Sequence, residues 1–430
     1  MNEDYNDFLS LSKRSKIVFY FLLFISIPYK FFFLQTQTAG YGPDYLEYRH
    51  LADLFLKEGI IGYIKSNDPY TLWRVPMLPF VLYITKTNTM LYVIQLIFSY
   101  FLAYNFYKIF KFITKNSAVA FTCFFAILFL PYINNAACAS LTEFLQVSFF
   151  IYSLRKVLYK QYDWKLTIVL SAFCLLRAEG EYFILFLILR ELFLKSYKRI
   201  TLYLIPICIV LLWSERNKSN FGTFSLVSPV MSSRALIGGL YGYIYTSDRN
   251  DFYTKYNYYD ARDYVNKKEF IATYKKVVRD EIKNKLTHEP LDYAKIRVNQ
   301  IAHAFLYFGF NLEHLPDHSW QYPKHPTVEE LQQINSEWAY STIFHNKDYV
   351  KLILRILYNG GLGFMHLFGF LFIFINYKKL LPLLFVLLNF SFVLFVEVDM
   401  RYLITIQAVC VCSFIIMSYS LIKYRTLMLN

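Results

Sequence analysis

Acidic and arginine side chains flank the apolar segments of this sequence, and their types suit one kind of chemistry. Asp44 and Glu47 follow a helix-breaking stretch at residues 40–43 and lie three residues apart, on one face of the helix expected to begin there. Arg74 closes the same polar stretch. A carboxylate can accept a proton from an attacking hydroxyl or amine, and a guanidinium can hold two oxygens of a phosphate. Residues of these types in one polar stretch would suit a site that exchanges a proton and binds an anion.

The elements that must position these residues are membrane helices. The chain has 430 residues, of which 56% are hydrophobic, 20% aromatic and 18% charged, and its 43 Phe and 39 Tyr are too many for a soluble domain of this size. Recurring apolar runs predict an all-α, polytopic membrane protein. Residues 1–10 are acidic and polar, which does not resemble a cleavable signal. The six cysteines have no metal-ligand spacing and are interpreted as inert thiols.

The net charge of +14 comes from basic clusters that alternate with the apolar runs. Such alternation is the positive-inside pattern of membrane proteins, and it places both termini in the cytoplasm. A nucleic-acid partner is not favoured, because the charge is spread over loops and forms no stripe. The basic clusters are Lys13, Arg14 and Lys16; Lys108, Lys111 and Lys115; Arg155, Lys156, Lys160 and Lys165; Arg190, Lys195, Lys198 and Arg199; Lys378 and Lys379; and Lys423 and Arg425.

About ten transmembrane helices are predicted, together with one apolar piece at 75–85 that is too short to cross and is interrupted by Pro76 and Pro79. We interpret that piece as a re-entrant or interfacial segment. Several spans are short, which favours broken or tilted helices around a cavity. The predicted spans are 16–34, 89–110, 118–132, 139–158, 166–176, 182–194, 200–213, 352–375, 380–396 and 402–422.

Three domains follow from this pattern. Residues 1–213 form an N-terminal transmembrane module that carries the first outer loop, 35–74, and residues 349–430 form the C-terminal transmembrane helices. Between them, residues 214–348 are expected to form a helical domain on the outer face. Its expected helices are an amphipathic one at 262–286, a second at 291–308 and a third opened by a capping box at 327–330.

The predicted topology puts the unusual charges on one face of the membrane. Charges at membrane depth are costly and usually face a cavity or a partner. Their convergence therefore predicts an active site at the outer face. The charges that converge are Asp44, Glu47, Arg74, Glu143, Arg177, Glu179, Glu181, Glu397, Asp399 and Arg401.

Five stretches, in order along the chain, resemble GT-C glycosyltransferases, most closely the protein-mannosyltransferase and lipid A aminoarabinose-transferase branch. The resemblance covers nearly the whole chain, and none of the five stretches lies within 250–348. Met77 stands where the family usually has Gly. The five stretches are GYGPDYLEYRHLADLFLKEG at 40–59, similar to the family's first outer loop; RVPMLP at 74–79, similar to Arg-x-Pro-Gly-x-Pro; Pro131 followed by LTE at 141–143, similar to Pro…Leu-Ser-Glu; Arg216 and Asn217 followed by FGTF at 221–224, similar to Arg-Asn…Phe-Gly; and EVDMRY at 397–402, similar to an acid followed by Arg-Tyr.

The resemblance implies a role for each candidate residue. Asp44 would be the general base, Glu47 would orient that base or contact the acceptor, and Glu143 would position the acceptor or a metal. The arginines would bind the phosphate of a lipid-linked donor. These substrate-binding candidates are Arg74, Arg177, and Arg401 with Tyr402.

Structural interpretations compete with some of these roles. Arg177 with Glu179 and Glu181 would also suit an ion pair at the end of a span, as would Arg401 beside Glu397 and Asp399, and Glu143 would suit a cap. His50 is interpreted as an interfacial residue. A loop cluster of histidines and an aspartate at 314–325 has no recognised metal-ligand spacing and is interpreted as solvated.

The resemblance implies an inverting glycosyltransferase that takes a sugar from a polyprenyl phosphate. Its acceptor would be a lipid, glycan or protein of the cell envelope, at the outer face of a bacterial cytoplasmic membrane. No cofactor is assigned, although the reaction leaves room for a divalent metal. Two rivals stay open: an O-antigen-type polysaccharide polymerase or ligase, and a non-enzymatic transporter or flippase of lipid-linked sugar. A transporter should show repeated halves and polar residues at mid-span, and the sequence pattern indicates neither.

Overall fold

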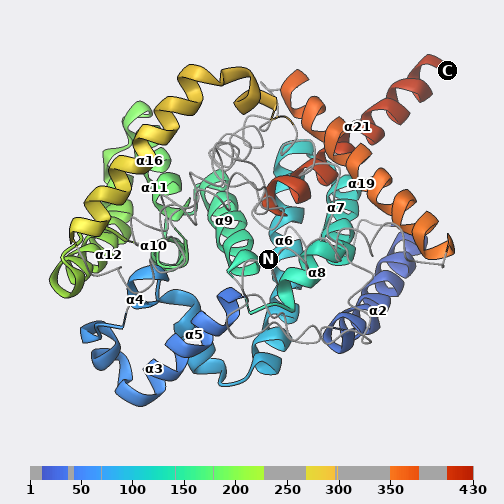
Figure 1. Cartoon of the computed structure of the whole chain (residues 1–430). Helices are drawn as coiled ribbons and strands as arrows, with labels where there is room; N and C mark the ends of the chain where they lie inside the picture. The colour runs from blue at the N-terminus through green and yellow to red at the C-terminus, as the bar shows by residue number, and fades with distance from the viewer. Residues whose placement is uncertain are drawn as a thin grey trace.

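Helices are the only regular secondary structure among the described residues in a computed structural model, with no strand in that part of the chain (Figure 1). The structure describes residues 12–36, 43–68, 70–140, 142–177, 179–226, 268–295, 298, 349–376 and 404–429, and within these ranges the side chains of Asp44 and Glu179 are among those outside the description. The helices are α2 (Lys13–Thr36), α3 (Pro43–Lys65), α4 (Tyr70–Trp73), α5 (Met77–Thr85), α6 (Asn88–Thr114), α7 (Ser117–Phe129), α8 (Pro131–Ala137), α9 (Glu143–Leu158), α10 (Trp164–Cys174), α11 (Glu179–Phe193), α12 (Tyr197–Phe221), α16 (Lys268–His288), α19 (Tyr349–Ile375) and α21 (Ile404–Leu429).

Four of the described helices, α2, α6, α12 and α21, are long and apolar enough to cross a membrane, and the bent pair α7–α8 makes a fifth if it is one span. The prediction of ten spans is not confirmed. Helices α9, α10 and α11 have 16, 11 and 15 residues. At 1.5 Å per residue they are about 16–24 Å long, shorter than the roughly 30 Å of a bilayer's apolar core. The predicted span 380–396 lies outside the described residues.

Helix α6 is the centre of the bundle and packs against α7 and α9 (Figure 1). Two contacts fix α9 alongside α6 in a parallel direction. The Tyr92 and Ser140 hydroxyls are 3.1 Å apart near one end, and the Tyr159 hydroxyl donates to the Lys108 carbonyl at 2.9 Å near the other. Because α9 begins at Glu143, the candidate acid lies close to the end of α6 that carries Tyr92.

The predicted span 118–132 is broken rather than continuous. Pro131 begins α8, and the axes of α7 and α8 differ by 53°. The Asn134 amide donates to the carbonyls of Leu128 and Leu130, at 3.0 and 2.8 Å, and so satisfies backbone groups that the break releases. The Lys30 ammonium of α2 donates to Asn134 Oδ1 at 2.8 Å, which ties α2 to this break.

Buried polar side chains do occur within a candidate span, contrary to the sequence analysis. Gln95, Ser99 and Asn105 of α6 are all buried. Both amide atoms of Gln95 lack a hydrogen-bond partner among the described residues. The sequence analysis did not single out these positions, because isolated polar residues hardly change the mean hydropathy of a long helix.

The short apolar piece at 75–85 forms the short helix α5, which packs against α3 and α6, and its re-entrant or interfacial position stays a prediction. The amphipathic helix predicted at 262–286 is α16, shifted to Lys268–His288. Of the helix predicted at 291–308, only residues 291–295 and 298 are described, and the capping box at 327–330 lies outside the description.

Candidate functional site

The first predicted outer loop is folded: helices α3 and α4, which together we call the platform, bring Glu47 next to Arg74. Helix α3 begins at Pro43, which suits a first helical position, and Glu47 lies about one turn later. Arg74 Nε donates to Glu47 Oε2 at 2.7 Å, and the Glu47 side chain is buried while that of Arg74 is partly buried. The Arg74 guanidinium also lies 5.1 Å from the centre of the Tyr48 ring. Two predicted site residues are thus in contact, whereas the Asp44 side chain lies outside the described residues.

Arg216 of α12 holds the far end of this platform. Its guanidinium donates to the carbonyls of Ile64 at 2.8 Å and Ser66 at 2.8 Å, and to the Thr71 hydroxyl at 2.8 Å. Helix α3 bends at Gly59, whose φ of 68° favours glycine, and Arg216 satisfies carbonyls that α3 leaves open where it ends. These hydrogen bonds hold α3 against α4 and α12. The shape of the platform therefore depends on Arg216 of α12 and not only on its own helices.

Asn217 and Gly222 complete the same structural unit. The Asn217 amide donates to the carbonyls of Ser225 and Leu226, at 2.8 and 3.1 Å. Gly222, with a φ of 71°, ends α12 in the left-handed conformation that favours glycine. The Arg-Asn…Phe-Gly stretch therefore has a structural role that sequence reasoning missed: it anchors the first outer loop.

A second acid–base pair lies on the platform. His50 Nε2 is 2.6 Å from Asp68 Oδ2, and the other oxygen, Asp68 Oδ1, accepts from the Tyr70 backbone N–H at 2.9 Å. Asp68 thus caps the start of α4 with one oxygen and orients the His50 imidazole with the other. His50, interpreted from the sequence as an interfacial residue, is half exposed and is paired with Asp68.

A second ion pair joins two further predicted site residues, Glu143 and Arg177. Arg177 Nη1 donates to Glu143 Oε1 at 3.3 Å and to the Thr142 hydroxyl at 3.0 Å. Glu143 is the first residue of α9, where the helix dipole favours an anion. The Met77 backbone N–H donates to the Leu175 carbonyl at 3.0 Å, which ties the segment after Arg74 to the turn that carries Arg177.

Glu181 does not form the ion pair with Arg177 that was an alternative from the sequence. Its Oε1 atom is buried and has no hydrogen-bond partner among the described residues. Burial raises the pKa of the Glu181 carboxyl above its ordinary value. Glu181 is therefore a carboxyl that holds its proton more readily than an exposed one.

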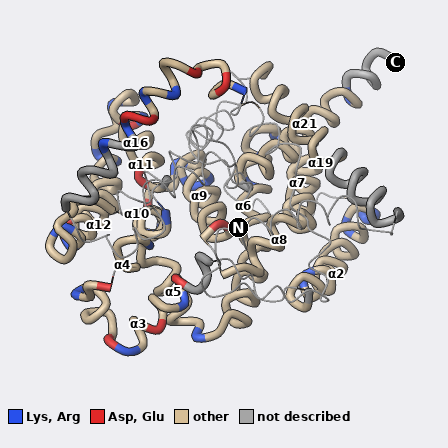
Figure 2. The backbone as a smooth tube through the Cα atoms, viewed as in Figure 1, with Lys and Arg blue, Asp and Glu red and all other residues tan. Residues whose placement is uncertain are grey.

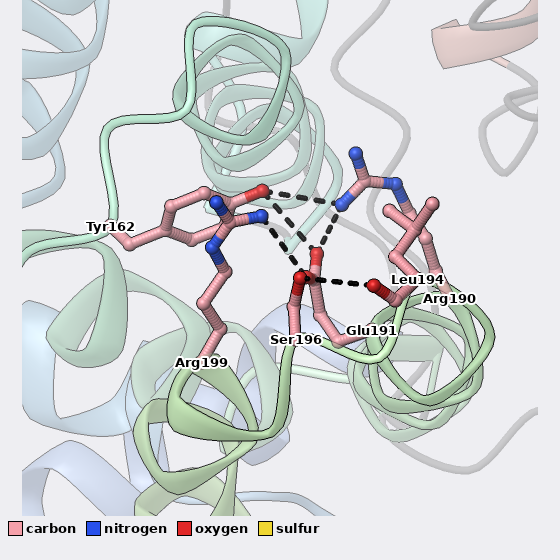
Figure 3. Close-up of polar contacts among 6 residues, drawn as sticks. All are labelled: Tyr162, Arg190, Glu191, Leu194, Ser196 and Arg199. Carbon is pink, nitrogen blue, oxygen red and sulfur yellow. Dashed lines mark hydrogen bonds and ion pairs between the residues drawn. The ribbon is translucent and has the colours of Figure 1, made fainter.

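Sequence reasoning also missed an acid inside a basic cluster (Figure 3). Glu191 of α11 is fully buried and accepts hydrogen bonds from Arg190, from Arg199 Nη1 at 3.2 Å and from the Tyr162 hydroxyl at 3.3 Å. It joins the end of α11 to the start of α12 and to the turn before α10. We assign it a structural role, because a buried carboxylate between two arginines is already neutralised.

The remaining predicted site residues, Arg401 and Tyr402 with their neighbours Glu397 and Asp399, lie outside the described residues. In the described part of the chain no group of three or more His, Cys, Asp and Glu side chains is placed to hold a metal ion. Acidic and basic positions lie side by side along α3 and along α16, whereas α7 and α8 carry neither (Figure 2).

Fold and site together define the class of the protein: an all-helical chain whose described part holds four helices, or five with the bent pair, that are able to cross a membrane. No protein-family model, curated protein or solved structure matches this chain.

Proposed function

We propose that the chain is a GT-C-type membrane glycosyltransferase. It transfers a sugar from a polyprenyl phosphate, with inversion, to a lipid, glycan or protein of the cell envelope. The reaction takes place at the outer face of a bacterial cytoplasmic membrane, with both termini in the cytoplasm. The resemblance of five stretches to that family is the sequence argument for this proposal.

One structural observation carries the proposal: the segment from α3 to α5, after the first apolar helix, is folded, carries paired charges and packs against candidate spans. Glu47–Arg74 and His50–Asp68 lie on it, Arg216 anchors it, and the Met77–Leu175 bond links it to Glu143–Arg177. An enzyme that binds a lipid phosphate needs cations held at fixed positions close to the membrane, since preorganised charges stabilise a leaving group without a cost of reorganisation.

The chemistry assigns a role to each group. The acceptor hydroxyl or amine attacks the anomeric carbon, a base on the first outer loop takes its proton, and Arg74 and Arg177 bind the phosphate that leaves. The family resemblance gives the role of base to Asp44, and the described part of the loop offers His50. Glu143 holds Arg177 and positions the acceptor. The proposal assigns no metal ligand among the described residues, so a divalent metal would need ligands from the rest of the chain.

The test is a transfer assay with purified protein in liposomes, using a polyprenyl-phosphate sugar extract as donor. Arg74→Gln should weaken donor use by roughly one to two decades, because a charge-assisted hydrogen bond to a phosphate contributes about 1.5–3 kcal/mol. Arg49→Gln is the matched control, since Arg49 lies on α3 in an exposed pair with Asp53. Equal kinetics of the two variants would make Arg74 structural, and no transfer by the wild type from any lipid-linked donor would refute the enzyme.

A transporter or flippase of lipid-linked sugar is the second candidate, and a specific observation favours it. Buried polar groups lie within candidate spans: Gln95 of α6, and Lys30 of α2 with Asn134. Intramembrane polar groups often mark a substrate path. Movement of a lipid-linked sugar across liposomes without transfer would support this candidate over the polymerase or ligase and over the proposed enzyme.

A further inference from the structure

We propose that His50, oriented by Asp68, is the general base of the outer-loop site and accepts the proton of the attacking group. This inference rests on the proposed function and names the residue that performs its proton transfer. It does not follow from the family resemblance, which points to Asp44.

The geometry gives the imidazole a defined orientation. A carboxylate only accepts hydrogen bonds, so the 2.6 Å contact with Asp68 Oδ2 puts the proton on Nε2 of His50. The neutral ring then carries its lone pair on Nδ1, and no described residue bonds to that atom. Asp68 is itself fixed, because Oδ1 accepts from the Tyr70 N–H at 2.9 Å and the Asp68 N–H donates to the Ser66 hydroxyl at 3.1 Å.

The position suits a base that meets an incoming acceptor. His50 lies three residues after Glu47 on α3, so the two side chains are neighbours on the helix surface. Glu47 is occupied by Arg74, the proposed phosphate ligand. The His50 side chain is 51% exposed, which leaves it open to an acceptor, whereas Glu47 is buried. The base and the phosphate ligand are therefore held on adjacent parts of one platform.

The step balances without a further reagent. The oxygen or nitrogen of the acceptor forms its bond to the anomeric carbon while its proton passes to His50 Nδ1. The bond from that carbon to the phosphate oxygen breaks, and its electron pair leaves with the polyprenyl phosphate. Asp68 stabilises the imidazolium that forms. The proton then passes from Nδ1 to water, which restores the base.

The competing explanation is that the His50–Asp68 pair only ties α3 to α4. Variants distinguish this structural role from the role of a general base. His50→Gln keeps a donor for Asp68 but cannot take a proton at neutral pH. A tether would tolerate it, whereas loss of a general base should lower kcat by about 10²–10⁴-fold with little change in the KM for donor. His50→Ala should be inactive and should regain transfer when imidazole is added, because the side chain is half exposed and a free ring can take its place.

Asp53→Asn is the matched control, since Asp53 lies on the same helix in an exposed pair with Arg49. Asp44→Asn is measured beside these variants in the same liposome assay. Normal kcat in His50→Gln with a large loss in Asp44→Asn would overturn the role of His50 and give it to Asp44, while the proposed function would stand. If the wild type transferred sugar from no lipid-linked donor, both would fail.

Discussion

Burial decides how individual acids of the site behave. Glu47 and Glu143 are buried with an arginine each, so their charges are compensated. Glu181 has a buried oxygen with no partner in the described part of the chain, and burial raises the pKa of its carboxyl. Three glutamates of similar sequence surroundings therefore have different chemistry, because only two of them meet a guanidinium.

The raised pKa of Glu181 predicts how its removal affects stability. A carboxyl whose pKa is higher in the folded chain makes folding less favourable as pH rises from its ordinary pKa through the raised one. Glu181→Gln should therefore be at least as stable as the wild type at neutral pH, and the difference should vanish in acid. Thermal unfolding in detergent between pH 4 and pH 8 measures this. A Gln variant that is clearly less stable at neutral pH would show that the ionised carboxylate has a stabilising partner.

Single glycines decide how closely two helices approach. A Cβ on Gly369 of α19 would lie 2.0 Å from the Cys410 carbonyl oxygen of α21, whereas a Cβ on Gly361 of the same helix would meet no described residue within 4 Å. Close approach through small residues is a common way for helices to pack in membranes. The two glycines therefore form a matched pair for a test at the scale of elements.

Gly369→Ala should force α19 away from α21 and destabilise the protein by about 1–3 kcal/mol, the usual effect of overpacking. Gly361→Ala should be neutral or slightly stabilising, because alanine is the better helix former. The readout is the fraction of protein that stays monodisperse after heating in detergent. Equal heat sensitivity of the two variants would mean that α19 and α21 separate without cost.

At the scale of the whole molecule, the basic clusters predict the orientation in the membrane. If the positive-inside pattern holds, the turn at Asn116 lies in the cytoplasm and position 257 lies outside. A single Cys at 257 should react with an impermeant thiol reagent in intact cells, and one at 116 or 378 should not. A Cys208→Ser background removes the exposed native thiol, since the other five cysteines are buried. Labelling at 116 would show that the predicted topology is inverted and that the candidate site does not lie on the outer face.

Local sequence determined the elements of this protein. Long apolar runs specify helices that can cross a membrane, Pro43 and Pro131 mark where helices begin, and Gly222 marks where one ends. These features need only neighbouring residues, because helix formation and its termination depend on local backbone geometry and periodicity. The individual site residues could be proposed for the same reason, since an acid or an arginine beside an apolar run is visible in the sequence.

Only the tertiary structure decided which of these residues meet. Glu47 and Arg74 are 27 positions apart, and Arg216 is 150 positions from the Ser66 carbonyl that it binds. In the sequence Glu191 is one acid among many bases, and the structure encloses it between its neighbour Arg190 and two donors from other elements, Tyr162 and Arg199. Partner choice and burial depend on how helices distant in sequence pack, and no local pattern encodes that packing.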